Sequence, residues 1–374
     1  MNKIKEKLGQ MFIIRMQEKE INDELISLIK DYHVGGISLY SKNYDSYEEM
    51  IKLINELKRI NSKYNNTPLF ISIDEEGGRV DRLPKEFVTL PSAKKISSKE
   101  ENIIEQGKII GEVLSKTGIN LDFAPVLDIQ RFPDNHAIGD RCFGDNKESV
   151  AKNGLLMMKT LNKYLMPVVK HFPGHGLIKR DSHMFLSKVI KNVKESDDIY
   201  PFLEAIKKEA PAIMVSHLIL KQIDKFNPAS LSKKVITGYI REELNYNGLI
   251  ITDDLKMKSV NVIYGYKRAA FKAINAGNDL VLIGSSYSIV KRCIDGVITK
   301  MNANIKDNID SSYERIINMK NKYKINDLEC KPVKVEKYND RINKLRNNIQ
   351  KRQKYVFFLT YYDIIKIGDR IWHI

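Results

Sequence analysis

The stretch L-F-I-S-I-D-E-E-G-G-R occupies residues 69–79 and changes character in its middle. Its first half is short and almost continuously apolar, which is typical of a β-strand buried on both faces of a parallel sheet. Its second half begins at Asp74 and is charged and rich in glycine, which is typical of a loop. This unit, a buried strand that ends in a polar loop, is therefore the pattern that we look for along the whole chain.

Similar apolar runs recur along the chain, and longer amphipathic stretches lie between most of them. The eight candidate strands are Met11–Met16, Gly36–Tyr40, Leu69–Asp74, Ile119–Val126, Met166–Lys170, Ala212–Ser216, Leu249–Asp253 and Asp279–Ile283. Apolar residues at helical spacing predict helices at Tyr47–Tyr64, Glu101–Thr117, Ser149–Tyr164, Ser196–Glu209, Lys233–Leu244 and Gly265–Ala276. This repeated alternation predicts an α/β fold, a (β/α)₈ barrel of the TIM type.

The end of the chain has a different composition. Ser311–Tyr323 has the pattern of a last barrel helix, whereas Lys320–Lys354 holds 12 Lys or Arg and 4 Asp or Glu. We expect a catalytic barrel at 1–327 and a short basic C-terminal appendage of unknown role at 328–374, because so short a segment cannot make a second domain of normal size. The sequence leaves open a docked helix and strand, a partner-binding element or an incomplete element.

The composition also bounds the class of protein. The net charge of +15 suggests an anionic partner, but no basic stretch contains a recognisable nucleic-acid module, so we expect no nucleic acid. The three scattered cysteines, Cys142, Cys293 and Cys330, predict no disulfide framework. Met1–Gln10 lacks the apolar core of a signal peptide, and no apolar run reaches the roughly 18 residues of a membrane helix. We therefore expect a cytoplasmic protein, of an oligomeric state that the sequence leaves open.

Polar side chains gather at the carboxyl ends of the predicted strands. Asp74 ends the third run, Lys170 and His171 end the fifth, His217 follows the sixth and Asp253 ends the seventh. Active sites of (β/α)₈ barrels lie at this end of the strands. The four strand ends therefore predict one pocket.

Asp253 and Asp254 follow each other directly at the end of a strand. Successive strand residues point to opposite faces, so only one of the two can face the barrel mouth, and the other should bond to the following loop. A carboxylate at the mouth could attack an anomeric carbon and later leave it. A capping role for both carboxylates is the alternative.

Asp181 and His183 are two residues apart in the stretch R-D-S-H at 180–183. In an extended loop they share a side, so Asp181 could orient the imidazole and stabilise its protonated form. Such a histidine suits a group that first donates a proton and then removes one. An ordinary surface loop is the alternative.

The histidines of this region also raise the question of a metal. His171 and His175 have the i, i+4 spacing of two ligands on a helix, but Pro173 and Gly174 between them disfavour a helix. The glutamate that follows the first histidine of zinc proteases is absent from this motif. We expect neither a metal nor a cofactor.

Two arginines follow the third and fourth strands. Arg82 comes eight residues after Asp74, and Arg141 lies in G-D-R-C-F-G at 139–144. A carboxylate that accepts hydrogen bonds and guanidinium groups that donate them suit the hydroxyl groups of a sugar. Structural ion pairs are the alternative.

Taken together, these motifs resemble glycoside hydrolase family 3, in its bacterial β-N-acetylglucosaminidase branch. The matching pieces cover about 1–325 and are I-D-E-E-G-G-R-V-D-R-L (73–83), G-D-R-C-F-G (139–144), K-H-F-P-G-H-G (170–176), D-S-H (181–183), P-A-S-L-S (228–232) and T-D-D-L-K-M (252–257). The resemblance implies that Asp253 is the nucleophile and that Asp181 with His183 is the acid/base dyad. It implies that the terminal N-acetylglucosamine is bound by Asp74, Arg82, Arg141, Lys170 and His171.

The resemblance also implies a function. We expect a retaining exo-β-N-acetylglucosaminidase that acts on cell-wall (muropeptide) fragments without a cofactor, through a covalent glycosyl-aspartate intermediate. On the same fold, a β-N-acetylglucosaminide phosphorylase or a β-glucosidase is the alternative. From other classes, a sugar-binding protein without catalysis and a nucleic-acid binder that uses 320–354 remain open, although retention of Asp253, Asp181 and His183 argues against the former.

Overall fold

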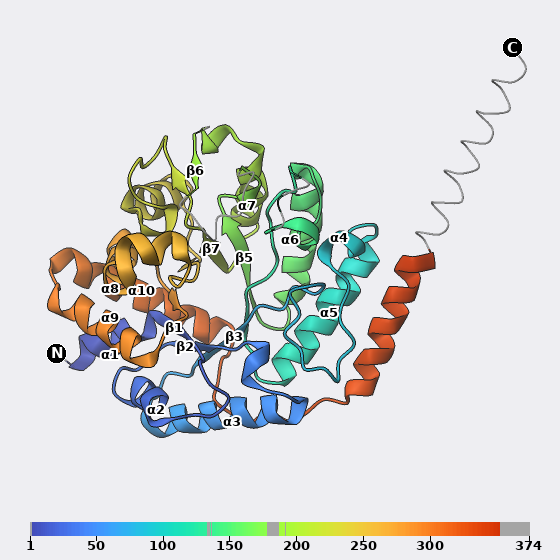
Figure 1. Cartoon of the computed structure of the whole chain (residues 1–374), viewed down its shortest axis with the longest axis horizontal. Coiled ribbons are helices and arrows are strands. Elements are labelled where there is room, and N and C mark those ends of the chain that lie inside the picture. The colour runs from blue at the N-terminus through green and yellow to red at the C-terminus, as the bar shows by residue number, and fades with distance from the viewer. Residues whose placement is uncertain (1, 133–134, 136, 178–186, 191, 352–374) are drawn as a thin grey trace, which may run out of the picture.

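The fold is known from a computed structural model, which describes residues 2–132, 135, 137–177, 187–190 and 192–351. Eight parallel strands form a barrel surrounded by helices (Figure 1). The strands are β1 (Phe12–Arg15), β2 (Gly36–Ser38), β3 (Phe70–Ile73), β4 (Leu121–Asp122), β5 (Met166–Phe172), β7 (Ala212–Val215), β9 (Leu249–Thr252) and β10 (Val281–Ile283). Each lies within, or overlaps most of, one of the eight predicted runs, so the prediction of a (β/α)₈ barrel is confirmed.

The barrel closes between β9 and β10. The order of hydrogen-bonded strands is β10-β1-β2-β3-β4-β5-β7-β9. A parallel bridge between Ile251 and Leu280 joins the two ends of this order, and the amide of Thr252 donates to the carbonyl of Leu280 at 3.0 Å. Closure brings the carboxyl ends of all eight strands to one face of the barrel.

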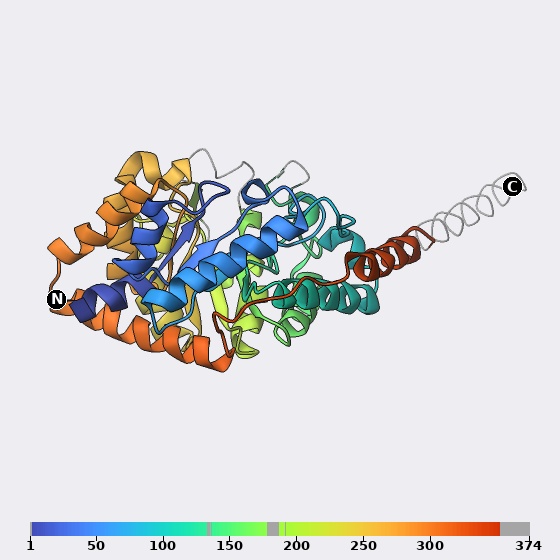
Figure 2. The ribbon, with the colours of Figure 1, turned by 90° about the horizontal axis from the view of Figure 1, so that it is seen from below.

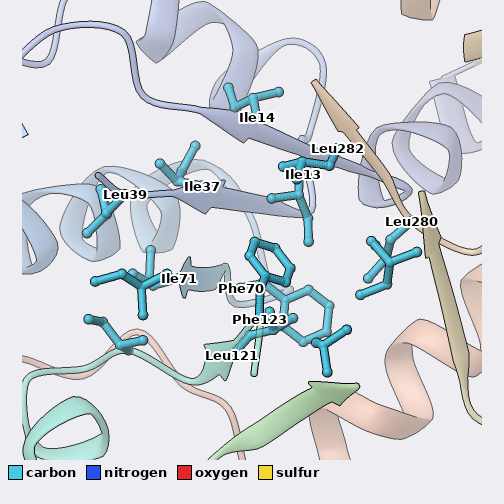
Figure 3. Packing of buried hydrophobic residues seen from close by; sticks show 14 of the residues in the cluster. Ile13, Ile14, Ile37, Leu39, Phe70, Ile71, Leu121, Phe123, Leu280 and Leu282 are labelled. Atoms are coloured by element: carbon cyan, nitrogen blue, oxygen red, sulfur yellow. The ribbon is translucent and has the colours of Figure 1, made fainter. Parts of the chain in front are cut away.

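Successive residues of a strand can pack into different parts of the core. Large apolar side chains such as Phe70 and Phe123 pack with residues of β1, β2 and β10 (Figure 3). On β9, Ile251 belongs to this large cluster, whereas Ile250 belongs to a second cluster with residues of helices α6 and α7. Gly36 makes room for Phe70, because a Cβ atom at Gly36 would lie 2.7 Å from that of Phe70.

Helices cover the barrel, and several begin at a side-chain cap. The helices are α1 (Asn2–Gln10), α2 (Asp23–Lys30), α3 (Tyr47–Tyr64), α4 (Ala93–Ile96), α5 (Glu100–Lys116), α6 (Lys147–Leu161), α7 (Tyr200–Lys207), the π-helix η7 (Lys234–Glu243), α8 (Lys258–Ala276), α9 (Tyr287–Thr299) and α10 (Ala303–Lys322). The side chains of Asn22, Ser46, Asn146 and Asn302 accept hydrogen bonds from the first turns of α2, α3, α6 and α10. Such caps satisfy backbone groups that a helix leaves unpaired, and they fix where it begins.

The differences from the prediction include three local details. The helix expected from Gly265 begins at Lys258 and is kinked at Gly265, whose φ of 66° favours glycine. The helix expected at 196–209 begins with a 3₁₀ turn, Asp197–Ile199, before α7. A second, two-stranded sheet of β6 (Lys188–Val189) and β8 (Ile219–Leu220) was not predicted, because two residues are too few to show an alternating pattern.

The described part of the C-terminal segment packs on the barrel. Residues 335–351 form a helix beside α5 (Figure 2), and its side chains Tyr338, Ile342, Leu345 and Ile349 are buried in the main core. The irregular segment before the helix is held to α3, because the amide of Val333 donates to the hydroxyl of Tyr47 at 3.1 Å. A docked helix is thus seen at 335–351, while residues 352–374 lie outside the described residues and the role of the segment stays a prediction.

Candidate active site

A cavity of about 550 Å³ opens at the carboxyl ends of the strands. It brings together six of the predicted site residues: Asp74, Arg82, Arg141, Lys170, His171 and Asp253. Asp181 and His183, the predicted acid/base dyad, lie outside the described residues. The predicted convergence of strand ends is therefore seen for these six residues, whereas His217, which was also expected in this pocket, is not among the residues that line it.

A buried network of charges forms one wall of the cavity. Lys170 Nζ lies 2.6 Å from Asp74 Oδ1 and 2.7 Å from Glu76 Oε1. Arg141 donates hydrogen bonds to the same glutamate from Nε and Nη2, both at 2.7 Å. Burial alone would lower the pKa of Lys170, but the two carboxylates outweigh burial and raise it. The lysine is thus held as an ammonium group where it can donate to a hydroxyl group of a ligand.

Asp128 orients the histidine next to this lysine. Asp128 Oδ2 lies 2.7 Å from His171 Nδ1, and its Oδ1 accepts from the amide of His175 at 2.8 Å. Burial would raise the pKa of Asp128, but His171 outweighs it and lowers the pKa to about 2. With Nδ1 held by Asp128, Nε2 is the ring nitrogen of His171 that could meet a substrate.

Asp253 and Asp254 differ in how they are held, although both line the cavity. Asp254 Oδ1 accepts from the amides of Lys256 at 2.9 Å and Gly284 at 2.8 Å, so it bonds to the adjoining loops. Asp253 Oδ1 accepts from the amide of Asp254 at 2.7 Å. The prediction that only one of the two carboxylates faces the barrel mouth is wrong, because both line the cavity. Asp254 does bond to the following loop, as expected.

The charge state of Asp253 follows from its neighbours. Burial would raise the pKa of this carboxyl group, but the electrostatic influence of His171 and then of His217 outweighs burial and lowers it. His217 itself is fixed, with Nδ1 2.6 Å from Ser230 Oγ and Nε2 3.1 Å from the carbonyl oxygen of Asp254. Asp253 is therefore an ionised carboxylate at neutral pH, which is the form that a nucleophile requires.

The cavity also contains residues that the sequence analysis did not select. Glu76 binds Arg141 and Lys170, and Arg15 and Tyr40 lie at the ends of the first two strands. Among the described residues, no group of three or more His, Cys, Asp and Glu side chains could hold a metal ion. Within the same part of the chain, no helix is long and apolar enough to cross a membrane.

Comparison with known proteins connects this geometry to a family. Residues 3–319 match the glycosyl hydrolase family 3 N-terminal domain. The chain belongs to glycosyl hydrolase family 3. The predictions of the family and of a glycosidase are thereby confirmed.

Relatives with similar sequences carry the name beta-hexosaminidase. That of Actinobacillus pleuropneumoniae serotype 5b is 32% identical over 298 residues, which cover 77% of this chain and 84% of the relative. That of Haemophilus influenzae is 32% identical over 295 residues, with 76% and 82% covered. A solved structure of a family 3 beta-N-acetylglucosaminidase from Paenibacillus has a TM-score of 0.85 and 32% identity, and the match covers 91% of this chain and 68% of that one.

Proposed function

We propose that the chain is a retaining exo-β-N-acetylglucosaminidase that removes terminal N-acetylglucosamine from cell-wall (muropeptide) fragments, in the cytoplasm and without a cofactor. The observation that carries this proposal is the position of Asp253 in the same cavity as the Lys170 network. The names of the relatives from Actinobacillus, Haemophilus and Paenibacillus support the N-acetylhexosamine part of the substrate.

The network would bind the terminal sugar by its hydroxyl groups. Asp74 can accept hydrogen bonds, while Lys170 and Arg141 can donate them. Because these groups already hold each other at 2.6–2.7 Å, they need little rearrangement when the sugar arrives. His171 and Arg82 complete the proposed set of sugar ligands.

Two displacements would then cleave the glycosidic bond. In the first, Asp253 attacks the anomeric carbon, the bond to the leaving oxygen breaks, and His183 gives that oxygen a proton. In the second, His183 takes a proton from water, the water oxygen attacks the same carbon, and the ester to Asp253 breaks. Two inversions retain the anomeric configuration, and Asp181 would orient His183 and stabilise its protonated form.

The substrate class is tested by rates on p-nitrophenyl β-N-acetylglucosaminide and on the corresponding glucoside, each with and without phosphate. We expect the N-acetyl sugar to be cleaved faster and phosphate to have no effect. Faster cleavage of the glucoside would replace the proposal by a β-glucosidase, and a rate that requires phosphate would replace it by a phosphorylase.

The residue roles are tested separately. A 2-fluoro sugar with a good leaving group should label Asp253, and an adduct on Asp254 would refute the assignment. His183→Ala should slow a disaccharide more than the p-nitrophenyl glycoside, by on the order of 10²–10⁴ for the natural linkage, because p-nitrophenolate leaves without a proton. Azide, which needs no deprotonation, should speed the breakdown of the glycosyl-enzyme. If His183→Ala slows both substrates equally and azide has no effect, His183 is not the acid/base.

A further inference from the structure

Three of the five large hydrophobic side chains that are exposed in the described part of the chain lie together on one face. They are Phe226, Val262 and Ile263, with 82%, 79% and 54% of their surface exposed. Val262 and Ile263 lie near the start of α8, and the hydroxyl of Tyr264 donates to the carbonyl oxygen of Phe226 at 3.1 Å. This bond holds the loop of Phe226 against α8. Single exposed apolar residues are common on protein surfaces, but a group such as this apolar patch indicates an interaction site.

The chain around the apolar patch is basic. Residues 256–272 contain five Lys or Arg and no Asp or Glu, and Lys225 is exposed beside the patch. The acidic residue of the same loop, Asp224, is buried, and its Oδ2 accepts from Asn227 Nδ2 at 2.9 Å and from Ser232 Oγ at 2.7 Å. This carboxylate therefore holds the loop together and is not presented at the surface.

A basic groove of about 690 Å³ runs between α8 and α9, which lie on one side of the barrel (Figure 1). Tyr264, which bonds to the loop of the patch, lines the groove. The other lining residues include no Asp or Glu but five cations, namely Lys267, Arg268, Lys272, Arg292 and Lys300. None of the five makes an ion pair with a residue that the structure describes. The only acidic residue of α9, Asp295, accepts from the hydroxyl of Tyr32 at 3.0 Å and does not line the groove. The groove therefore carries uncompensated positive charge beside the apolar patch.

The two features together require a partner that is both anionic and apolar. A soluble polyanion would pair with the cations of the groove but would leave the three apolar side chains in water. The surface of a bilayer with anionic phospholipids supplies both environments at one boundary. Its phosphate groups attract Lys and Arg within about a Debye length, and apolar side chains can enter the region where the headgroups meet the acyl chains.

We propose that the apolar patch and the basic groove form a docking face for the surface of an anionic phospholipid bilayer. Phe226, Val262 and Ile263 enter the boundary between headgroups and acyl chains, and the cations of the groove bind the lipid phosphates. The protein is thereby held at the membrane surface without a spanning helix. This inference goes beyond the proposed glycosidase function and does not depend on it.

The test is co-sedimentation of the full chain with lipid vesicles, in the absence of any sugar. One set of vesicles contains phosphatidylcholine alone, and the other contains an equimolar mixture of phosphatidylcholine and phosphatidylglycerol. We expect the partition coefficient to be at least about 10-fold higher on the anionic vesicles, because the cations contribute only there. Added salt should weaken this binding because it screens the charges.

A pair of double variants tests the groove. Lys267→Gln combined with Arg268→Gln removes two exposed cations and should lower binding to the anionic vesicles by about 10-fold. Lys94→Gln combined with Lys95→Gln is the matched control, because it changes the net charge equally at two exposed neighbours on α4, on the other side of the barrel (Figure 1). The control should bind almost like the wild type.

A pair of single variants tests the apolar patch. Phe226→Ser removes a large apolar side chain from the docking face and should lower binding to the anionic vesicles by about 10-fold, because less apolar surface is buried. Leu328→Ser is the matched control, since Leu328 is 72% exposed and lies before the C-terminal helix. Every substituted side chain is exposed, so each variant should keep the circular dichroism spectrum of the wild type.

Three results would overturn the proposal. The first is equal binding to the two kinds of vesicle, or binding to neither. The second is an equal loss of binding in the two double variants, which would show that overall charge governs binding and not this face. The third is self-association without vesicles that Phe226→Ser abolishes, which would make the face an interface between copies of this chain. Because no sugar is cleaved in these measurements, the proposed glycosidase function stands or fails separately.

Discussion

Arg141 and Glu76 form a two-pronged ion pair in the wall of the cavity, with Nε–Oε2 and Nη2–Oε1 distances of 2.7 Å. Lys170 reaches the same carboxylate at 2.7 Å. Burial alone would raise the pKa of Glu76, but Arg141 and Lys170 hold it far below its usual range. One buried carboxylate thus positions two of the proposed sugar ligands.

Glu76→Gln should therefore destabilise the protein as well as impair sugar binding. The variant keeps the shape of the side chain but leaves two buried cations with one carboxylate fewer, and breaking a buried pair costs about 3–5 kcal/mol. Because the folded pKa is depressed, this stabilisation is present above the ordinary pKa of the carboxyl group and is lost as the pH falls below it. Urea unfolding of both proteins at pH 7 and pH 4 measures the difference, which should be smaller at pH 4.

Glu48→Gln is the matched control for this experiment. Glu48 pairs with Lys52 on the surface of α3, with both side chains more than 70% exposed. Exposed pairs contribute about 0–1 kcal/mol, so the control should unfold almost like the wild type. Equal effects of the two substitutions would contradict a special role of the buried pair.

The ionisation of Asp253 gives a prediction about pH. Its pKa is lowered despite burial, with His171 and His217 as the largest opposing causes. In the wild type, labelling of Asp253 by a 2-fluoro sugar should therefore stay fast from pH 7 to pH 5. His217→Gln removes the electrostatic influence of His217, so the pKa of Asp253 should rise and the labelling rate should decline toward pH 5.

His33→Gln, at the amino end of β2, is the control for that series. Its labelling profile should match that of the wild type. A melting temperature should accompany each rate, because His217 also bonds to Ser230 and to the backbone of Asp254. Identical profiles for His217→Gln and the wild type would show that His217 does not control the charge of Asp253.

The barrel could be predicted from the sequence because its strands are buried on both faces. Such strands are short apolar runs that stand out between amphipathic helices, as 249–253 does. Elements whose structure depends on tertiary contacts show no such apolar pattern in the sequence. The pairing of β6 with β8 depends on neighbours that are distant in sequence.

The site could be predicted in part, for a related reason. Asp74, Lys170 and Asp253 stand at strand ends, where position alone suggests function. Glu76 follows its strand by three residues, and Asp128 lies in a loop, so only their contacts reveal what they do. Arg15 and Tyr40 lie at or next to the ends of apolar runs, so the rule that selected Asp74 would have found them in the first two strands.

The helix at 335–351 should be part of the cooperative fold, because its apolar face joins the main core. Ile342 is fully buried there. Ile342→Ala removes buried methyl and methylene groups and leaves a cavity, which should cost about 2–5 kcal/mol in the free energy of unfolding. Lys344→Ala changes an exposed position of the same helix and should cost less than about 0.5 kcal/mol. A helix that unfolds independently would show little difference between the two variants in urea unfolding followed by circular dichroism.

Lys320 closes the opposite end of the barrel from the cavity. It extends from α10, and its Nζ donates to Gln10 Oε1 at 2.8 Å and to the carbonyl oxygens of Gly35 at 3.0 Å and Pro68 at 2.6 Å. These acceptors precede β1, β2 and β3, so one side chain ties three strands together at their amino ends. Three acceptors require three N–H donors, which only the ammonium form provides.

Lys320→Met should therefore lower the free energy of unfolding by about 3–5 kcal/mol, because three buried oxygen acceptors lose a charged donor. Burial lowers the pKa of Lys320 to about 7. Between that value and the ordinary pKa of lysine, the unfolded chain binds a proton that the folded chain does not, so wild-type stability should rise with pH relative to the variant. Urea unfolding at pH 7 and pH 9 measures this, with the exposed Lys322→Met on the same helix as control. If the difference between wild type and Lys320→Met is the same at both pH values, the three acceptors fully offset burial and Lys320 keeps an ordinary pKa.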